Sequence, residues 1–171
     1  MTNTQFPIPL FPSFFSYLHL MSVDKSLLEK ARAYCVYQER SQQEVRDKLY
    51  DWGLHRAEVE QCIAQLVSEN YLNEQRFAIA YAGGKFRVKE WGRIKIKLAL
   101  KQKKVSDYCI RKALEEIGSR EYKSTLAKLI SKKSKEVKES NPVKKKYKVA
   151  QYAISRGFEP EMVWETIGDH S

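Results

Sequence analysis

Residues 77–104 read FAIAYAGGKFRVKEWGRIKIKLALKQKK and combine a repeated hydrophobic pattern with dense positive charge. Between Lys85 and Lys104 there are nine Lys or Arg residues and one acid, Glu90. Apolar residues alternate with these cations, so one side of the segment can be buried while the other stays charged. We expect this stretch to fold as helix and to bind something acidic.

The chain before this stretch has the pattern of a three-helix unit. Apolar residues at three- and four-residue spacing begin at Leu27. Ser41 and Glu44 form the S-x-x-E sequence of a capping box, which predicts a helix start. Gly53 follows this second helix and suits the left-handed conformation at a helix end. A third helix with Val59 on its buried side completes the unit.

The same unit recurs twice further along the chain. Shifting its apolar positions by 51 residues, and then by 53 more, places apolar residues on apolar residues. The five sets are Val45, Ile96 and Val149; Leu49, Leu100 and Ala153; Leu54, Val105 and Phe158; Val59, Ile110 and Val163; and Ile63, Leu114 and Ile167.

Repetition at this period indicates tandem structural repeats, each burying its core against its own helices and its neighbours. We therefore expect an all-α fold of three tandem three-helix repeats that form an elongated, curved molecule. The expected boundaries are residues 23–72 for repeat one, 73–120 for repeat two and 121–171 for repeat three, after a disordered or non-native extension at 1–22.

Signals at the helix ends agree with this register. Asn73 and Ser106 are favoured N-cap residues, and Pro142 and Pro160 suit the first position of a helix. The lysine-rich segment 132–148 is interrupted at Asn141-Pro142. We expect a mobile connection there, between the first two helices of repeat three.

Lys104 departs from the pattern of the other two repeats. It stands where they have Gly53 and Gly157. The left-handed conformation costs a residue with a side chain about 1–2 kcal/mol. This helix either carries that cost or ends in another way.

The positive charge is concentrated in one part of the chain. The net charge is +10 overall, with −2 over residues 24–76, +15 over 77–148 and −3 over 149–171. Such a surface attracts nucleic acid, an acidic protein groove or an anionic membrane, unless it is simply a solvated lysine-rich face. No apolar run reaches the roughly 18 residues that cross a membrane.

The sequence offers no residues for catalysis, a metal or a cofactor. The three histidines are far apart and have no acid or cysteine at a suitable spacing. Gly83-Gly84-Lys85 lacks the other residues of a Walker loop. The cysteines, Cys35, Cys62 and Cys109, have no CxxC spacing and are expected to be free and buried in a reducing cytoplasm. We expect a protein that is not an enzyme.

The segment from Trp91 to Lys103 has two apolar sides on a helical wheel. Ile96 and Leu100 are the core positions of the repeat, whereas Trp91, Ile94 and Leu98 lie on the opposite side. A central repeat has a neighbour on each side. We therefore expect the second apolar side to pack against the neighbouring repeats.

Between these two sides lies a stripe of cations. Arg93, Lys97 and Lys101 are four residues apart and share a helical face, and Lys85 and Lys89 extend the series backwards. Stacked cations repel one another by a few tenths of a kcal/mol per pair. Because folding gains nothing from this repulsion, the stripe is the best candidate for binding an acidic partner.

Three short motifs have a recognisable pattern. They are Arg40-Ser41, Glu44-Val45 and Lys48-Leu49, then Tyr71-Leu72-Asn73-Glu74-Gln75-Arg76-Phe77-Ala78, and above all Trp91-Gly92-Arg93-Ile94 with Leu98 and Leu100. On these residues the chain resembles the RecX family, the bacterial regulators of the RecA recombinase. The similarity covers about residues 25–168 and includes the number and order of the repeats.

The resemblance implies a cytoplasmic, monomeric inhibitor that lies in the groove of the RecA–DNA filament and modulates recombination, DNA repair and the SOS response. Its partners would be RecA and the DNA in the filament. The alternative is a stand-alone nucleic-acid-binding module that contacts phosphates. Charge, and for Arg93 also the motif, gives the candidate contact residues Lys85, Arg87, Lys89, Arg93, Lys97, Lys101, Lys144, Lys145, Lys146 and Lys148.

Overall fold

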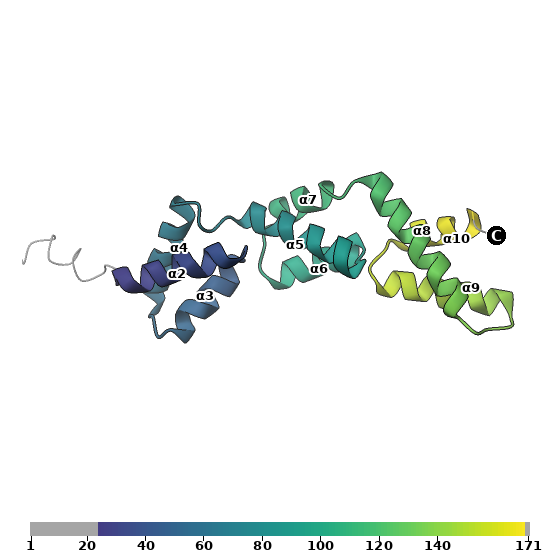
Figure 1. Cartoon of the computed structure of the whole chain (residues 1–171), viewed down its shortest axis with the longest axis horizontal. Helices are drawn as coiled ribbons and strands as arrows, with labels where there is room; N and C mark the ends of the chain where they lie inside the picture. Colours follow the sequence, from purple (N-terminus) through teal and green to yellow (C-terminus); the bar gives the residue numbers. More distant parts are fainter. Residues whose placement is uncertain (1–23, 170–171) are drawn as a thin grey trace, which may run out of the picture.

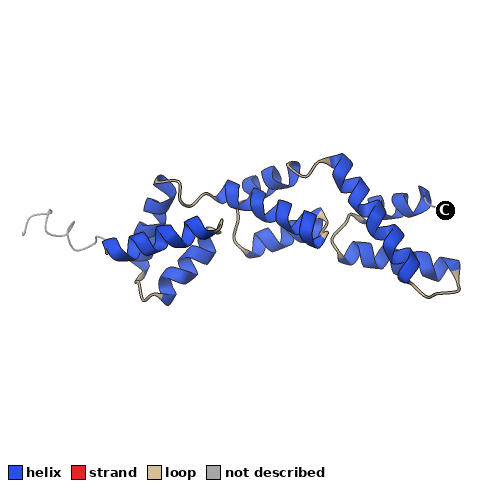
Figure 2. Ribbon diagram, in the orientation of Figure 1, coloured by secondary structure: helices blue, strands red, loops and turns tan. Residues whose placement is uncertain are grey.

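The computed structural model describes residues 24–169, whose regular secondary structure is entirely helical (Figure 2). The extension expected at residues 1–22 lies outside this part. The helices are α2 (Lys25–Tyr37), α3 (Gln42–Asp51), α4 (Arg56–Ser68), α5 (Glu74–Lys89), α6 (Arg93–Gln102), α7 (Asp107–Glu115), α8 (Ser119–Glu136), α9 (Pro142–Ser155) and α10 (Pro160–Asp169).

The helices form three consecutive units along the long axis of an elongated molecule (Figure 1). We call α2–α4 the first unit, α5–α7 the middle unit and α8–α10 the third unit. The predicted all-α tandem-repeat fold is confirmed. The third unit begins with α8 at Ser119, slightly before the expected boundary at residue 121.

The predicted helix starts are present. Ser41 and Glu44 form a reciprocal capping box, in which the Glu44 N–H donates to Ser41 Oγ (3.1 Å) and the Ser41 N–H donates to Glu44 Oε2 (2.9 Å). Asn73, Ser106 and Asn141 each accept a backbone N–H from the first turn of the next helix. These side chains satisfy amides that otherwise have no partner within the helix.

The second helix of each unit ends in the same left-handed turn, including the one at lysine. Gly53, Lys104 and Gly157 have φ values of 88°, 57° and 92°. At Lys104 the N–H donates to the Lys101 carbonyl (2.9 Å), and the following Val105 N–H donates to Leu100 (3.2 Å). This is a Schellman turn. Of the two possibilities for this helix end, the middle unit therefore has the left-handed turn, with its conformational cost at Lys104.

The repeated apolar positions form the core, with one exception. Fourteen of the fifteen side chains are buried, and Leu114 is half-buried. The buried residues fall into two clusters. One lies within the first unit, from Leu28 to Leu72, and the other runs through the middle and third units, from Phe77 to Ile167. The repeats therefore share a pattern but do not share one continuous core.

The joint between the first and middle units is polar. Lys103 Nζ, at the end of α6, donates to Glu44 Oε1 (2.7 Å), and Arg76, in α5, forms an ion pair with Glu39. These contacts depend on charge and remain accessible to water. The first unit is therefore held to the rest by interactions that salt and pH can weaken.

The joint between the middle and third units is a close backbone contact. The Gly92 N–H donates to the Arg156 carbonyl (2.9 Å), and the Ile94 N–H donates to the Gly157 carbonyl (3.0 Å). A Cβ atom on Gly92 would lie 2.1 Å from the Gly157 carbonyl carbon and oxygen. Only glycine fits at position 92, and the two units meet through this contact as well as through their common core.

The expectation for the second apolar side of the middle unit was partly wrong. The helix begins at Arg93, so Trp91 lies in the preceding loop, half-buried against the shared core. Ile94 and Leu98 are 50% and 59% exposed. They form no seam between units, because the close contact of Gly92 with Gly157 supplies the joint instead.

Two smaller features complete the fold. The lysine-rich segment of the third unit is mostly helical, since only residues 137–141 separate α8 from α9. All three cysteines are free and buried, and burial raises the pKa of the Cys35 thiol to about 11. None of the helices described is long and apolar enough to cross a membrane.

Candidate functional site

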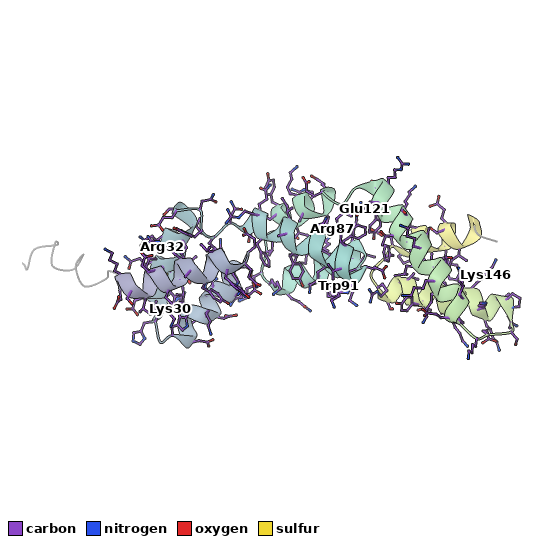
Figure 3. The ribbon with its side chains drawn as sticks, in the orientation of Figure 1. Lys30, Arg32, Arg87, Trp91, Glu121 and Lys146 are labelled. Atoms are coloured by element: carbon purple, nitrogen blue, oxygen red, sulfur yellow. The ribbon has the colours of Figure 1, made fainter. Side chains whose placement is uncertain are left out.

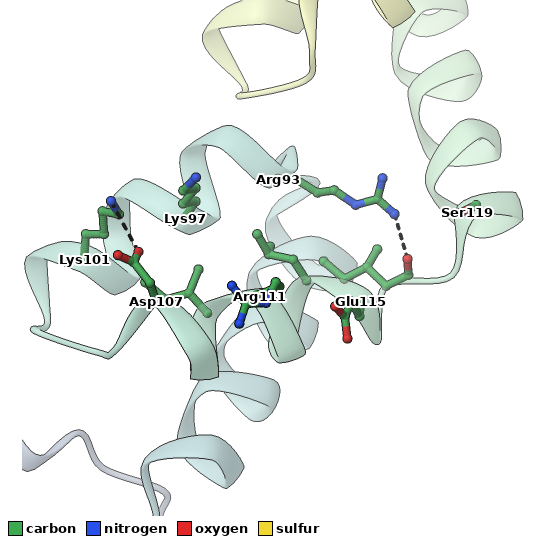
Figure 4. A pocket seen from close by; sticks show the side chains of 10 residues that line it. Arg93, Lys97, Lys101, Asp107, Arg111, Glu115 and Ser119 are labelled. Carbon is green, nitrogen blue, oxygen red and sulfur yellow. Dashed lines mark hydrogen bonds and ion pairs between the residues drawn. The ribbon is translucent and has the colours of Figure 1, made fainter.

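An open groove of about 790 Å³ lies between α6 and α7 and reaches the start of α8 (Figure 4). Its basic lining comes from Arg93, Lys97 and Lys101 on α6 and from Arg111 on α7. The α6 residues line the same groove because they lie four residues apart on one helical face. The predicted stripe is thus brought together, but with a fourth cation that the sequence analysis did not select.

Arg93 has a role in the fold. Its Nη2 donates to the Ile117 carbonyl (2.9 Å), and its guanidinium lies 4.2 Å from the centre of the Tyr122 ring. Its backbone N–H donates to the Tyr122 hydroxyl (2.9 Å), which in turn donates to Glu159 (2.7 Å). Burial, followed by the hydrogen bond to Glu159, raises the pKa of Tyr122. Arg93 therefore links the start of α6 to the start of α8 through its backbone and side-chain contacts.

The other three cations differ in their surroundings. Lys101 Nζ lies 3.3 Å from Asp107 Oδ1 in an ion pair. Lys97 and Arg111 have no ion-pair partner within the part of the chain that the structure describes (Figure 4). Both side chains are exposed. Among the cations that line the groove, Lys97 and Arg111 are therefore the two that are exposed and have no ion-pair partner within residues 24–169, one on each wall.

The first unit carries an ion pair at the positions of Lys97 and Arg111. A shift of 51 residues relates α6 to α3 residue by residue, and it relates Lys97 to Arg46 and Arg111 to Glu60. Arg46 Nε lies 2.9 Å from Glu60 Oε1. The hydrogen bond from Arg46 lowers the pKa of the Glu60 carboxyl. The same pair of helices in the repeat can therefore have either an ion pair or two positive charges at these positions.

Leu114 gives the groove an apolar floor. It is the one repeated core position that is only half-buried, and it lines the groove together with the buried side chains Ile110 and Ile117. Its counterparts Ile63 and Ile167 are buried. The groove therefore combines accessible hydrocarbon with positive charge, which favours an occupant that has an acidic group beside an apolar one.

The remaining candidates of the middle unit lie elsewhere. Lys85, Arg87 and Lys89 belong to α5, which is separated from α6 by a left-handed residue, Glu90 (φ 49°). They do not line the groove, so the four-residue series is interrupted at this turn. Lys85 Nζ lies 5.1 Å from the centre of the Trp91 ring, and Figure 3 marks Arg87 and Trp91 on the middle unit.

The lysines of the third unit form a separate basic region on the first turns of α9. Lys144, Lys146 and Lys148 are exposed and Lys145 is half-buried. Figure 3 labels Lys146 on the third unit. Lys148 Nζ lies 2.6 Å from Glu139 Oε2 and is partly neutralised. The ten candidates therefore divide among α5, the α6–α7 groove and α9.

Arg111 lines the groove but is not among the residues that the sequence predicted for it. The residues four positions before and after it on α7 are the acids Asp107 and Glu115, so it does not belong to a four-residue series of cations like that of α6. Only the packing of α7 against α6 brings it opposite Lys97. Alignment with the first unit could have revealed it, because the position holds Glu60 there.

Comparison with known proteins gives consistent matches. Models of the first, second and third three-helix domains of RecX match residues 28–66, 73–114 and 121–167. A protein of Clostridium perfringens (strain SM101 / Type A) named regulatory protein RecX is 33% identical over 121 residues, which are 70% of this chain and 56% of the relative. One of the same name from Bacillus mycoides is 26% identical over 146 residues, covering 85% and 54%.

Solved structures agree in fold. The crystal structure of RecX from Lactobacillus salivarius superimposes with a TM-score of 0.76 at 23% identity, over 83% of this chain and 92% of that one. A second crystal structure, of a regulatory protein RecX, gives 0.81 at 20% identity, over 94% and 80%. The chain spans about half the length of the curated relatives it matches. On the matches of all three domain models, in order, the chain belongs to the RecX family.

Proposed function

We propose that this protein is a regulator of RecA that binds the RecA–DNA filament and inhibits it, with the α6–α7 groove as the main contact. Family membership supports a regulatory role, since the relatives are named regulatory protein RecX. The elongated arrangement of three units suits a surface that follows a filament groove (Figure 1). Inhibition by binding requires no catalytic residues.

The observation that carries the proposal is the pair of unneutralised cations, Lys97 and Arg111. The equivalent pair in the first unit, Arg46 and Glu60, is an ion pair, so the scaffold accommodates neutralisation. Two like charges on facing walls cost stability, although only a few tenths of a kcal/mol at an exposed site. An acidic group of a partner that enters between them removes this repulsion and gains charge-assisted hydrogen bonds.

The apolar floor favours protein as the contact in this groove. A phosphate backbone gains little from Leu114, whereas an acidic protein segment with a neighbouring aliphatic side chain can cover it. Ile94 and Leu98 add exposed apolar surface on the same helix, α6. We therefore assign the groove to RecA itself and not to the DNA inside the filament.

The test measures RecA on single-stranded DNA. The unaltered chain is expected to co-sediment with the filament and to inhibit its ATP hydrolysis. The double variant K97E/R111E is expected to lose at least tenfold in both, because attraction becomes repulsion at the centre of the contact.

The matched control is K128E/K132E, which has the same change in net charge at two exposed lysines of α8. It is expected to keep most of the inhibition, and circular dichroism verifies that both variants are folded. Absence of binding and inhibition by the unaltered chain at micromolar concentration would refute the function. Equal losses in the two variants would refute the groove as its site.

A further inference from the structure

Two exposed aromatic rings lie together on the third unit, away from the α6–α7 groove. Tyr147, on α9, is 57% exposed, and Trp164, on α10, is 42% exposed. Their ring centres are 6.3 Å apart and the planes are inclined by 39°. Large aromatic side chains stabilise a protein mainly through burial. This pair leaves much of its ring surface in water.

The fold does not require aromatic residues at these positions. Shifts of 53 and 51 residues relate Tyr147 to Ile94 and Gln43. The same shifts relate Trp164 to Arg111 and Glu60. The other two units therefore form the same helix pair with aliphatic, polar or charged residues there, and the two rings are particular to the third unit.

Positive charge lies on one side of the rings. Lys144 and Lys148 are near Tyr147 on α9 and line, with Val143 and Glu139, an open hollow of about 500 Å³. Lys148 is paired with Glu139, whereas Lys144 has no ion-pair partner among residues 24–169. The acids Glu161 and Glu165 neighbour Trp164 on α10. An anionic ligand is therefore favoured on the α9 side.

We propose that Tyr147 and Trp164 form a stacking site for bases of single-stranded nucleic acid, with Lys144 and Lys148 contacting the backbone phosphates. Aromatic rings beside a basic groove are the arrangement that binds single strands without sequence preference, because every base has a π face. A duplex fits poorly because its base faces are already stacked. The site deepens the proposed function, since it gives the DNA strand a contact separate from the groove assigned to RecA.

The test uses no RecA, so its failure is distinguishable from failure of the proposed function. Fluorescence anisotropy measures binding of a labelled oligothymidylate and of an abasic strand of equal length. The double variant Y147A/W164A is expected to lose about tenfold or more in affinity for the oligothymidylate. It is expected to bind the abasic strand as the unaltered chain does, because phosphate contacts remain.

The control variant is Y108A, which removes a ring that is 54% exposed on α7, and the conservative variant is Y147F/W164Y. Both are expected to bind oligothymidylate almost normally. Equal losses on the two strands, or no loss on either, would overturn the stacking site. A loss with Y108A as large as that with Y147A/W164A would also overturn it, because the effect would then not be specific to the two rings.

Discussion

The α3–α4 face of the first unit and the α6–α7 face of the middle unit are built from equivalent helices of the repeat, but the charge is neutralised in one and not in the other. Arg46 pairs with Glu60 in one, and Lys97 and Arg111 are both unpaired cations in the other. Since both faces fold, the charge difference is not dictated by the helices. Folding does not explain why the middle unit has two unpaired cations at these positions. We propose that they are there to bind a partner.

The two faces also differ in what supports them. The first unit has a core of its own, whereas the middle unit shares its core with the third. The helices that form the groove are therefore held by a core that the middle and third units share. The first unit is joined to it by ion pairs. Variants can test this difference by disrupting either the packing between the middle and third units or the ion pairs that join the first unit.

The largest effect is expected from G92A. A Cβ at this position would lie 2.1 Å from the Gly157 carbonyl, so the two units cannot keep their contact. We expect a loss of about 3 kcal/mol, the upper end of the usual cost of overpacking, measured by urea unfolding, with the middle and third units unfolding before the first. G84A is the control, because nothing lies within 4 Å of its added Cβ. If G92A matched G84A, the glycine contact would not join the units.

A smaller loss is expected from Y122F. The Tyr122 hydroxyl accepts from the Arg93 N–H and donates to Glu159, and both groups lose a partner when it is removed. The expected cost is about 1–3 kcal/mol of unfolding free energy. Binding to RecA filaments is expected to persist where the variant is folded. Loss of binding with unchanged stability would instead assign this network to the partner contact.

The next effect comes from making the first unit resemble the middle one. E60R replaces the Arg46–Glu60 pair by two cations and is expected to cost about 0.5 kcal/mol, measured from the urea midpoint. The swap R46E/E60R restores opposite charges and is expected to recover this loss. If E60R were neutral, the pair in the first unit would contribute nothing and the comparison between the faces would lose its energetic basis.

The smallest effect concerns pH at the polar joint. Burial raises the pKa of Glu44, but the hydrogen bonds from Lys103 and Ser41 outweigh it, so the pKa lies below its ordinary value. The contribution is therefore complete above the ordinary glutamate pKa of about 4.3 and is lost as pH falls through the lower folded-state value.

Urea midpoints measured from about pH 6 to pH 3 follow this loss. E44Q keeps the capping box, since glutamine also fits it, and is expected to show a weaker dependence on pH. An identical pH profile in E44Q would exclude Glu44 as its source.

The sequence predicted what depends on local chemistry. The capping residues, the turns at Gly53 and Gly157 and the repeated core all follow from short-range spacing. For Lys104 the sequence left two possibilities open, and the structure shows the left-handed turn. The sequence could not predict the contact of Gly92 with Gly157, which joins residues far apart in the chain. For the same reason it could not show that Arg93 is hydrogen-bonded within the fold, or that Arg111 lines the same groove as Lys97 once α7 packs on α6.

The central claim is that unneutralised charge across the α6–α7 groove binds RecA. Its most direct test is R111E, which gives the middle unit the glutamate that the first unit has at the same position. Inhibition of RecA ATP hydrolysis on single-stranded DNA is measured against concentration for the unaltered chain, R111E and R111K. We predict a loss of about tenfold or more for R111E and near-normal inhibition by R111K. The stability of R111E is expected to change by less than about 1 kcal/mol, because attraction to Lys97 is offset by repulsion from Asp107 and Glu115 on the same helix. A folded R111E that inhibits as well as the unaltered chain would contradict the claim.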